Sequence, residues 1–266
     1  MVRLPIPDLG GWFHKIMVAA IIQARMGSTR LPGKVLKKVL GKTMLEHQIE
    51  RVKRAKTIDR IILATTDNLE DKKIIRLGGK LKVQVFAGSE TDVLDRYYQA
   101  AQRFGANDTI VRLTGDCPLM DPGVIDEVVS FYLKNKKECQ YASNVNPPTF
   151  PDGMDTEVFS FKALKEAWQK AGLPSEREHV TPYIRNHPEK FKIKNLKSKK
   201  DLSRFRLTLD NQKDFVLIKK IFTALYPKKK NFDLKDILEF LKRNPKLTSI
   251  NSYIQRNEGM LKSLRM

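Results

Sequence analysis

The richest source of chemistry in the sequence is an eleven-residue loop, Ala24–Lys34. It holds two arginines, one lysine, two hydroxyl side chains and two glycines, directly after a short apolar run. Glycines let backbone N–H groups come close to an anion, and arginine and lysine neutralise its charge. This composition is typical of a polyphosphate site.

The spacing within this loop excludes two common phosphate motifs. A Walker A loop has four residues between its glycines and Ser or Thr after its lysine. Here five residues separate Gly27 from Gly33, and Val35 follows Lys34. The absence of a GxGxxG motif argues against a nicotinamide cofactor. A basic surface turn is the alternative, but three cations in one loop are too concentrated to suit it well.

Two aspartates are candidates for a metal site. Asp116 follows the apolar stretch 109–113, and Asp210 follows the stretch 205–209. Carboxylate oxygens suit Mg²⁺, which usually takes one or two carboxylates together with substrate phosphates. Alone, Asp116 could cap a turn and Asp210 could begin a helix. If the two meet across the top of a sheet, they would complete a metal site.

These residues need a scaffold that brings distant loops to one edge. In the first half, apolar β-branched runs alternate with helical patterns, which predicts parallel βαβ units and a three-layer α/β/α fold with a mostly parallel sheet. Such sheets bind ligands at the carboxyl ends of their strands. The expected strands are 17–23, 60–65, 82–86 and 109–113, and the expected helices are 43–55, 68–77 (stopped by two glycines), 92–104 and 122–134.

The second half is less regular. A linker at Tyr226-Pro227 divides a main domain, 17–227, from a helical C-terminal appendage, 228–266, and residues 1–16 are expected to form a flexible extension. The expected strands are 156–161, 191–196 and 205–209, and the expected helices are 161–171, 175–185, 211–225 and 233–242.

Charge and composition exclude several classes of protein. The net charge is +20, but the 50 basic residues are spread along the chain without interleaved aromatics or a nucleic-acid-binding motif, so we expect a solvated basic surface and no specific nucleic acid partner. No apolar run reaches the length of a transmembrane helix. The first residues lack the features of a signal peptide and there are only two cysteines, which favours a cytoplasmic location.

The order of these motifs resembles the cytidylyltransferase family. The shared pattern is ARMGSTRLPGK after the first strand, TTD after the second, GDCPL after the fourth, and a late LDNQKD. Further stretches, GSETDVLDRYYQAA, FPDGMDTEVFSF, SEREHVTPYI and NPKLTSINSYIQRNEG, are closest to the branch of the spore-coat polysaccharide biosynthesis protein F, or SpsF. The likeness runs from about Met17 to Gly259.

The resemblance implies a nucleotide-diphospho-sugar transferase fold of GT-A type, which is Rossmann-like, and a reaction in which CTP and a sugar acid give a CMP-sugar and diphosphate. It implies Mg²⁺ held by Asp116 and Asp210, and a catalytic set of Arg25, Arg30, Lys34 and Asp116. The implied nucleotide contacts are Ala24, Arg25, Gly27, Ser28, Arg30, Lys34, Thr66, Asp67, Gly88, Asp92 and Arg96. By analogy a homodimer is expected, and the pathway is surface polysaccharide or glycan synthesis.

Polar residues of the second half are the candidates for the acceptor pocket, because polar side chains suit sugar hydroxyls. Arg177 could hold a carboxylate. The full acceptor set is Asn144, Asp152, Asp155, Glu157, Arg177, Glu178, His179 and Thr181.

Alternative functions stay open at this point. A nucleotidyltransferase that uses a sugar 1-phosphate or another nucleoside triphosphate would need the same loop and metal site. A GT-A glycosyltransferase would need a DxD motif at a strand end, and the chain has no convincing one. A non-catalytic binder would be signalled by loss of Lys34 or Asp116, and both are present.

Overall fold

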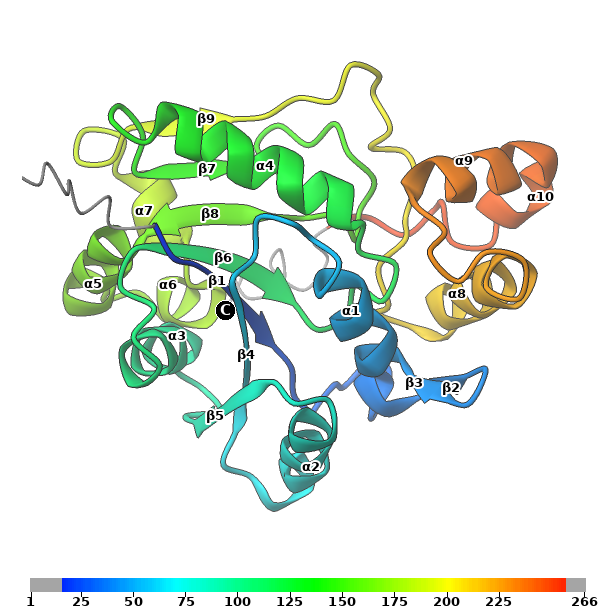
Figure 1. Cartoon of the computed structure of the whole chain (residues 1–266), viewed down its shortest axis with the longest axis horizontal. Helices are drawn as coiled ribbons and strands as arrows, with labels where there is room; N and C mark the ends of the chain where they lie inside the picture. Colours follow the sequence, from blue (N-terminus) through cyan, green and yellow to red (C-terminus); the bar gives the residue numbers. More distant parts are fainter. Residues whose placement is uncertain (1–15, 257–266) are drawn as a thin grey trace, which may run out of the picture.

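A seven-stranded sheet forms the centre of the protein, with strands in the order β5-β4-β1-β6-β8-β7-β9 (Figure 1). The computed structural model describes residues 16–256. The strands are β1 (Val18–Gln23), β4 (Arg60–Thr66), β5 (Gln84–Gly88), β6 (Thr109–Thr114), β7 (Tyr141–Ser143), β8 (Glu157–Ser160) and β9 (Ile193–Asn195). A separate two-residue pair, β2 (Lys38–Val39) and β3 (Lys42–Thr43), is antiparallel.

The parallel half of the sheet carries the loops that matter for chemistry. Strands β5, β4, β1 and β6 are parallel to one another, while β8 runs antiparallel to β6 and to β7. The carboxyl ends of β1, β4, β5 and β6 therefore lie along one edge. The mostly parallel α/β architecture expected from the sequence is confirmed.

Helices cover both faces of this sheet. On β1 the side chains of Val18, Ala20 and Ile22 belong to one hydrophobic cluster, and those of Ala19 and Ile21 belong to another, as the alternation of a strand requires. The first cluster includes α1 (Met44–Val52), α2 (Lys72–Lys80) and α4 (Pro122–Asn135); the second includes α3 (Val93–Arg103), α5 (Phe161–Lys170) and α7 (Pro182–Asn186).

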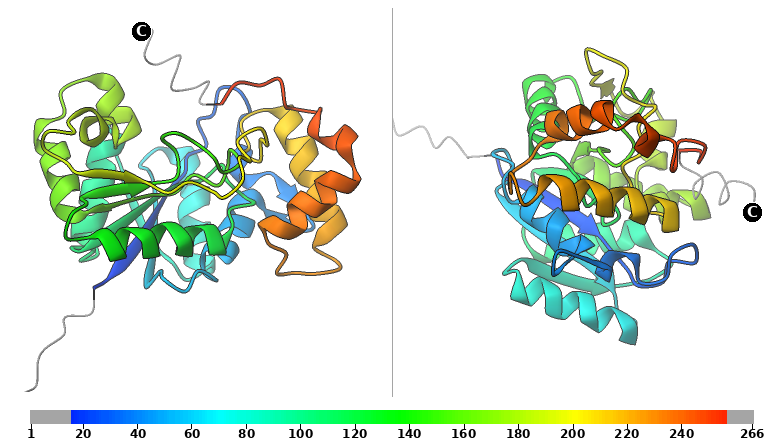
Figure 2. Two further views of the ribbon diagram at one scale, coloured as in Figure 1. Left: turned by 90° about the horizontal axis from the view of Figure 1, so that it is seen from above. Right: turned by 90° about the vertical axis from the view of Figure 1, so that its right-hand side faces the viewer.

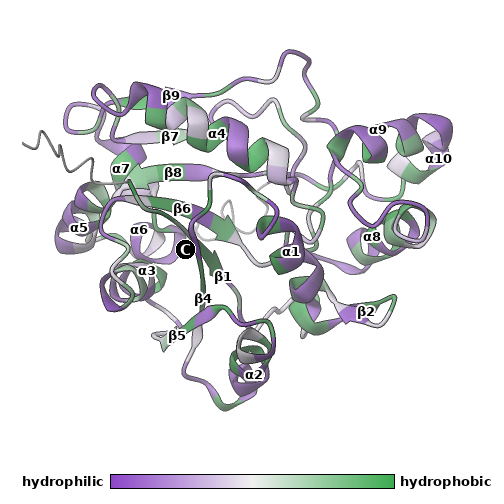
Figure 3. Cartoon of the chain, viewed as in Figure 1, coloured by the Kyte–Doolittle hydropathy of each residue, from purple (hydrophilic) through white to green (hydrophobic). Residues whose placement is uncertain are grey.

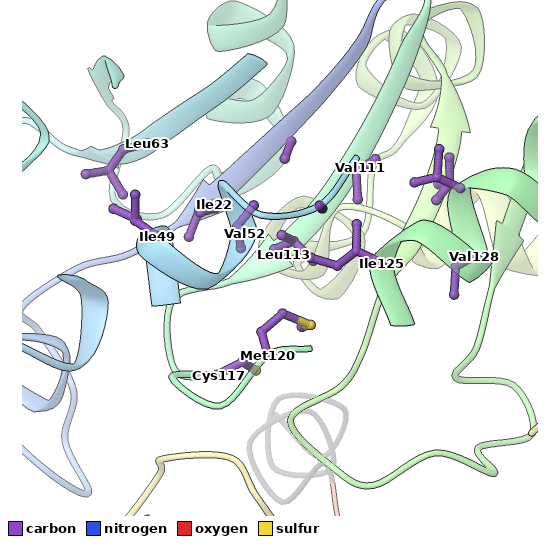
Figure 4. Packing of buried hydrophobic residues seen from close by; sticks show 14 of the residues in the cluster. Ile22, Ile49, Val52, Leu63, Val111, Leu113, Cys117, Met120, Ile125 and Val128 are labelled. Carbon is purple, nitrogen blue, oxygen red and sulfur yellow. The ribbon is translucent and has the colours of Figure 1, made fainter. Parts of the chain in front are cut away.

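The packing of the first face is seen directly in Figure 4, where Ile49 and Val52 of α1 meet Ile22 and Leu63 of the sheet. Coloured by hydropathy, the central strands β1, β4 and β6 are mostly apolar, whereas α5 and α9 carry many polar residues (Figure 3). This is the burial pattern expected of a three-layer α/β domain.

Several predicted boundaries were wrong for identifiable reasons. The helix expected to stop at Gly78-Gly79 continues through both glycines to Lys80, and the absence of a side chain at Gly78 lets β5 approach, since a Cβ there would lie 2.3 Å from Val85. The expected helix 175–185 is interrupted because Val180 adopts φ 72° and Pro182 begins a new helix. It forms α6 (Pro174–His179) and α7.

The expected strand 205–209 joins no ladder. Its only strand-like pairing among residues 16–256 is a single parallel bridge between Asp152 and Arg206. Strand β7, which lies between β8 and β9, was not predicted, because its three residues are too few to show a pattern. Short 3₁₀ turns, η1 (Lys34–Leu36) and η2 (Leu69–Asp71), complete the loops after β1 and β4.

The C-terminal helices gather at one end of the sheet, opposite α5 (Figure 2). They are α8 (Gln212–Leu225), α9 (Leu234–Arg243) and α10 (Pro245–Thr248). Phe232, Ile237 and Leu241 lie beyond the expected division at 227, and they share one hydrophobic cluster with Leu119 and Leu207 of the main domain. The division at 227 stays a prediction, as does the flexible extension, which lies almost wholly outside the described residues. Between residues 16 and 256 we find no helix with the length and apolar character to span a membrane.

Candidate active site

Lys34 is the centre of an ion-pair cluster at the carboxyl edge of the sheet. Its Nζ lies 2.7 Å from Oδ2 of Asp116 and 2.8 Å from Oδ1 of Asp210. Arg30 lies 2.9 Å from the same oxygen of Asp210. The three elements that meet here are the loop after β1, the loop after β6 and the start of α8. Asp116 and Asp210, predicted to pair across the sheet top, thus share one ammonium group.

Lys34 and Asp116 hold each other in their charged forms. Burial alone would raise the pKa of Asp116, but the charge and hydrogen bond of Lys34 outweigh it and lower that pKa to about 2. Burial alone would lower the pKa of Lys34, and the two aspartates outweigh it, so that this pKa is raised. At neutral pH Asp116 is therefore a carboxylate and Lys34 is protonated.

The paired carboxylates fit a magnesium ion that completes its coordination with ligands from outside the protein. Residues 16–256 contain no group of three or more His, Cys, Asp or Glu side chains arranged to hold a metal. Two carboxylates on one cation are the donor set expected when Mg²⁺ takes its remaining ligands from water and substrate phosphates. Asp116 and Asp210 would hold the ion.

The loop after β1 is folded around Met26. Its carbonyl oxygen accepts hydrogen bonds from the N–H groups of Ser28 at 2.8 Å and Gly33 at 3.2 Å. Gly33 adopts φ 63°, a left-handed conformation that glycine tolerates without strain. The resulting turn directs Arg30 towards Asp210 and Lys34 towards both Asp116 and Asp210.

The remaining predicted nucleotide residues lie along the ends of β1, β4 and β5. Ala24 donates its N–H to Ala64 at 3.0 Å, and Asp67 donates its N–H to Gly88 at 3.2 Å. Arg25 pairs with Glu90 at 3.2 Å, close to the surface. Gly27 and Ser28 lie in the loop itself, and the buried Thr66 ends β4.

Arg96 is a buried cation of this nucleotide side. It is 2% exposed, and its Nη1 donates to the carbonyl oxygen of Ser89 at 2.8 Å. Within residues 16–256 it forms no ion pair with a carboxylate, and its Nε has no hydrogen-bond partner. Burial lowers its pKa. A guanidinium in this position is suited to an anionic or carbonyl group of a ligand.

On the predicted acceptor side, Arg206 organises the carboxylates. It forms ion pairs with Asp152 at 2.8 Å, Asp214 at 2.9 Å and Asp210 at 3.3 Å. Burial, together with the nearby charge of Asp155, raises the pKa of Asp152 to about 7 despite this pairing. Asp155 in turn pairs with Arg256. Arg206 therefore connects Asp152, a predicted acceptor residue, to Asp210 of the ion-pair cluster around Lys34.

Three predicted acceptor residues lie beneath the surface. Asn144 bonds to the backbone of Met154 and Thr156. Glu157 accepts hydrogen bonds from Thr181 and Arg112. We therefore expect Asn144, Glu157 and Thr181 to support the acceptor side rather than touch a sugar.

Arg177, expected to hold a carboxylate, is already paired. Its Nε lies 2.9 Å from Oδ2 of Asp92, a residue predicted for the nucleotide side, and its Nη1 donates to the carbonyl oxygen of Trp168. Glu178 is exposed, and its Oε2 lies 3.9 Å from Nε2 of His179. Burial lowers the pKa of His179. The structure thus places Arg177 beside Asp92, the N-cap residue of α3, and not beside the other predicted acceptor residues.

Sequence reasoning did not single out Arg206, Arg256 or Glu90. Arg206 left a usable signal, since it is a charged residue inside the alternating run RFRLTLD. Glu90 accepts hydrogen bonds from both Arg25 and Asn68, and nothing in the local sequence of Glu90 or Arg256 indicates their partners.

A polyphosphate-type loop after a central parallel strand, with two carboxylates at the same edge, defines a nucleotide-binding α/β enzyme. A family model for cytidylyltransferases matches residues 19–256, and the chain belongs to the cytidylyltransferase family. It is accordingly a nucleotidyltransferase, and the resemblance seen in its sequence is confirmed.

Individual relatives agree with this assignment. SpsF, a spore coat polysaccharide biosynthesis protein of Bacillus subtilis, is 34% identical over 235 residues, which are 85% of this chain and 94% of SpsF. The structure of a cytidylyltransferase from Leptospira borgpetersenii superposes with a TM-score of 0.83 at 36% identity, covering 91% of this chain and 98% of that one. The 3-deoxy-manno-octulosonate cytidylyltransferase of Geobacter sulfurreducens is 36% identical over 118 residues, 44% of this chain and 46% of that enzyme.

Proposed function

We propose that the protein transfers CMP from CTP to a hydroxyl group of a sugar acid of the ulosonic or nonulosonic type, releasing diphosphate, with Mg²⁺ held by Asp116 and Asp210. The observation that carries the proposal is the meeting of Lys34, Asp116 and Asp210 at the end of the loop 24–34. Surface polysaccharide or glycan synthesis is the proposed role of the product, in keeping with the name of SpsF.

The side chains present suit this reaction. The acceptor hydroxyl attacks the α-phosphorus and diphosphate leaves, so negative charge increases on the phosphoryl oxygens and on the leaving group. Arg30 and Lys34 are placed on the loop to bind the phosphates and stabilise that charge. Bound Mg²⁺ would supply further charge neutralisation and would help to ionise the attacking hydroxyl.

Diphosphate release tests the proposal. CTP, UTP, GTP and ATP are each combined with Mg²⁺ and a panel of ulosonic acids, nonulosonic acids and amino-sugar 1-phosphates. We expect release with CTP and a 2-keto sugar acid only. Release with a sugar 1-phosphate would refute the acceptor class, and the absence of both release and Mg²⁺-dependent CTP binding would refute the site itself.

Asp108 and Asp116 lie just outside the two ends of β6 and provide a matched pair of variants. Asp116→Asn should abolish release, because Asp116 lies at the carboxyl end of the strand. Asp108 lies at the opposite end, where its carboxylate accepts a hydrogen bond from the N–H of Met17 at 3.0 Å. Asp108→Asn should therefore retain activity. The homodimer expected by analogy is a separate proposal that sedimentation equilibrium tests.

A further inference from the structure

Asp71 is a buried carboxylate that does not stabilise the helix it precedes. It is the N-cap residue of α2 and is 1% exposed, yet its side chain makes no capping hydrogen bond to that helix. Asp71 is also the last residue of η2 and its backbone is helical (φ −77°, ψ −8°), whereas an aspartate that caps a helix has a non-helical backbone. The side chain of Asp71 is directed instead at the loop after β1 and at the last residues of β4.

Both oxygens of this carboxylate accept hydrogen bonds, one from the loop after β1 and the other from the end of β4. Oδ1 accepts the N–H of Met26 at 2.7 Å. Oδ2 accepts the Oγ1 hydroxyl of Thr65 at 3.0 Å, the N–H of Thr66 at 3.1 Å and the Oγ1 hydroxyl of Thr66 at 2.5 Å. Four donors thus converge on one buried side chain, and one of them belongs to the loop 24–34.

The bond to Met26 has consequences for the whole loop. Met26 is the residue whose carbonyl oxygen accepts the N–H groups of Ser28 and Gly33. Asp71 accepts a hydrogen bond from the N–H of Met26. The carbonyl oxygen of Met26 accepts the hydrogen bonds that close the turn, and this turn positions Arg30 and Lys34. The path from Asp71 to the phosphate-binding side chains therefore runs through a single backbone residue.

We propose that Asp71 is a positioning residue that fixes the loop 24–34 against the end of β4 and so prepares it for the triphosphate. The inference rests on the proposed assignment of that loop to the nucleotide. Holding the loop in its binding conformation removes the conformational cost of ordering it when the ligand arrives. Asp71 is not itself expected to touch the nucleotide.

Charge and geometry make opposite predictions for one substitution. A carboxylate near the loop repels an incoming triphosphate, so if its charge mattered most, Asp71→Asn would tighten CTP binding. If its geometry matters most, Asp71→Asn weakens binding, because an amide has one acceptor oxygen in place of two and its NH₂ group faces other donors. We expect weaker binding.

The experiment compares Asp71→Asn, Asp71→Ala and Thr65→Val with the wild type. Isothermal titration with CTP and with inorganic triphosphate gives Kd values, and steady-state kinetics give kcat and the KM for CTP and for the acceptor. We expect Asp71→Ala to raise the Kd for both ligands by about tenfold or more, with Asp71→Asn intermediate and the acceptor KM little changed. Thr65→Val removes a single hydroxyl donor and should shift the Kd in the same direction by less, even if both Asp71 variants fail to fold.

Asp126→Ala is the matched control. Asp126 accepts the N–H groups of Lys56 and Thr57 at 3.0 and 2.8 Å and the hydroxyl of Thr57 at 2.7 Å, the same kinds of donor, but away from the loop 24–34. It should lower thermal stability and leave the Kd for CTP unchanged.

The inference is overturned if Asp71→Asn binds CTP as tightly as the wild type, or if Asp126→Ala weakens binding equally. Failure of the wild type to bind CTP would refute the proposed function instead, and the inference with it.

Discussion

Replacing Lys34 by methionine should turn a stabilised ion-pair cluster into a repulsive one. Methionine keeps most of the length of the side chain but removes the ammonium group. Asp116 and Asp210 then lose the cation that both of them contact, at 2.7 and 2.8 Å. At pH 7 the variant should be less stable than the wild type.

The size of the loss follows from how deeply the groups are buried. The side chain of Lys34 is 12% exposed, and those of Asp116 and Asp210 are 25% and 17% exposed. Removing one partner of a buried pair costs about 3–5 kcal/mol. Here water reaches both aspartates, and Arg30 and Arg206 still contact Asp210. We therefore expect a loss of about 2–3 kcal/mol in the free energy of unfolding, or about 5–10 °C in Tm.

Lys42→Met provides the comparison. Its ammonium group also makes two short contacts, at 2.6 and 2.8 Å, but both are to Glu50, and the two side chains are 32% and 37% exposed. Such an exposed pair contributes about 0–1 kcal/mol. Urea denaturation of both variants and the wild type at pH 7, in EDTA, measures the difference.

The same titrations in millimolar MgCl₂ test the metal assignment without any turnover. Two carboxylates that lack their ammonium partner should attract the ion, so Mg²⁺ should stabilise Lys34→Met more than the wild type. The reasoning is refuted if Lys34→Met costs no more than Lys42→Met. Absence of any Mg²⁺-dependent gain in Lys34→Met would refute the paired aspartates as a metal site.

Three further outcomes can be measured by denaturation. Burial lowers the pKa of His47, so the unfolded chain binds a proton before the folded chain does as the pH falls through about 6.5. The free energy of unfolding of the wild type should therefore decrease below that pH, and His47→Gln should make this decrease smaller. Gly115→Ala would place a Cβ 2.7 Å from the carbonyl oxygen of Gln23, which should cost about 1–3 kcal/mol and reduce diphosphate release by displacing the adjacent aspartate. Arg206→Leu should cost about 3–5 kcal/mol because it leaves Asp214 buried without its cation, and adding Asp214→Asn should recover part of the loss.

The parallel core could be predicted because its signals are local. The run Met17–Gln23 is apolar and β-branched, and each later strand of the core is followed by an amphipathic helix. Boundaries failed where a distant element decided them. The glycine at 78 reads as a helix stop, but it packs under Val85, and the run 205–209 alternates like a strand but finds no ladder partner.

The predictions for the candidate site also succeeded or failed for structural reasons. Asp116 and Asp210 were predicted to pair, and the structure brings them together around Lys34. Lys34 and Asp116 follow the parallel strands β1 and β6, which deliver their loops to one edge, whereas Asp210 follows a run that joins no ladder. The partners of Arg177 could not be predicted, since its pairing with Asp92 depends on how α6 packs against α3. Asn144 and Glu157 show a further limit. Polar residues suggest an exposed binding surface, but they can equally satisfy one another in the interior.

Asn251, which is synthesised late, bonds to residues of the carboxylate cluster. Its amide donates hydrogen bonds to the carbonyl oxygen of Arg206 at 3.1 Å and to Asp214 at 2.8 Å, and it is buried with them. The carboxylate cluster beneath Asp210 is therefore complete only after position 251 has been made and has folded back. Nascent or truncated chains that end earlier would contain every proposed nucleotide contact but would lack this buried support, so we expect the cluster to be completed only late in synthesis.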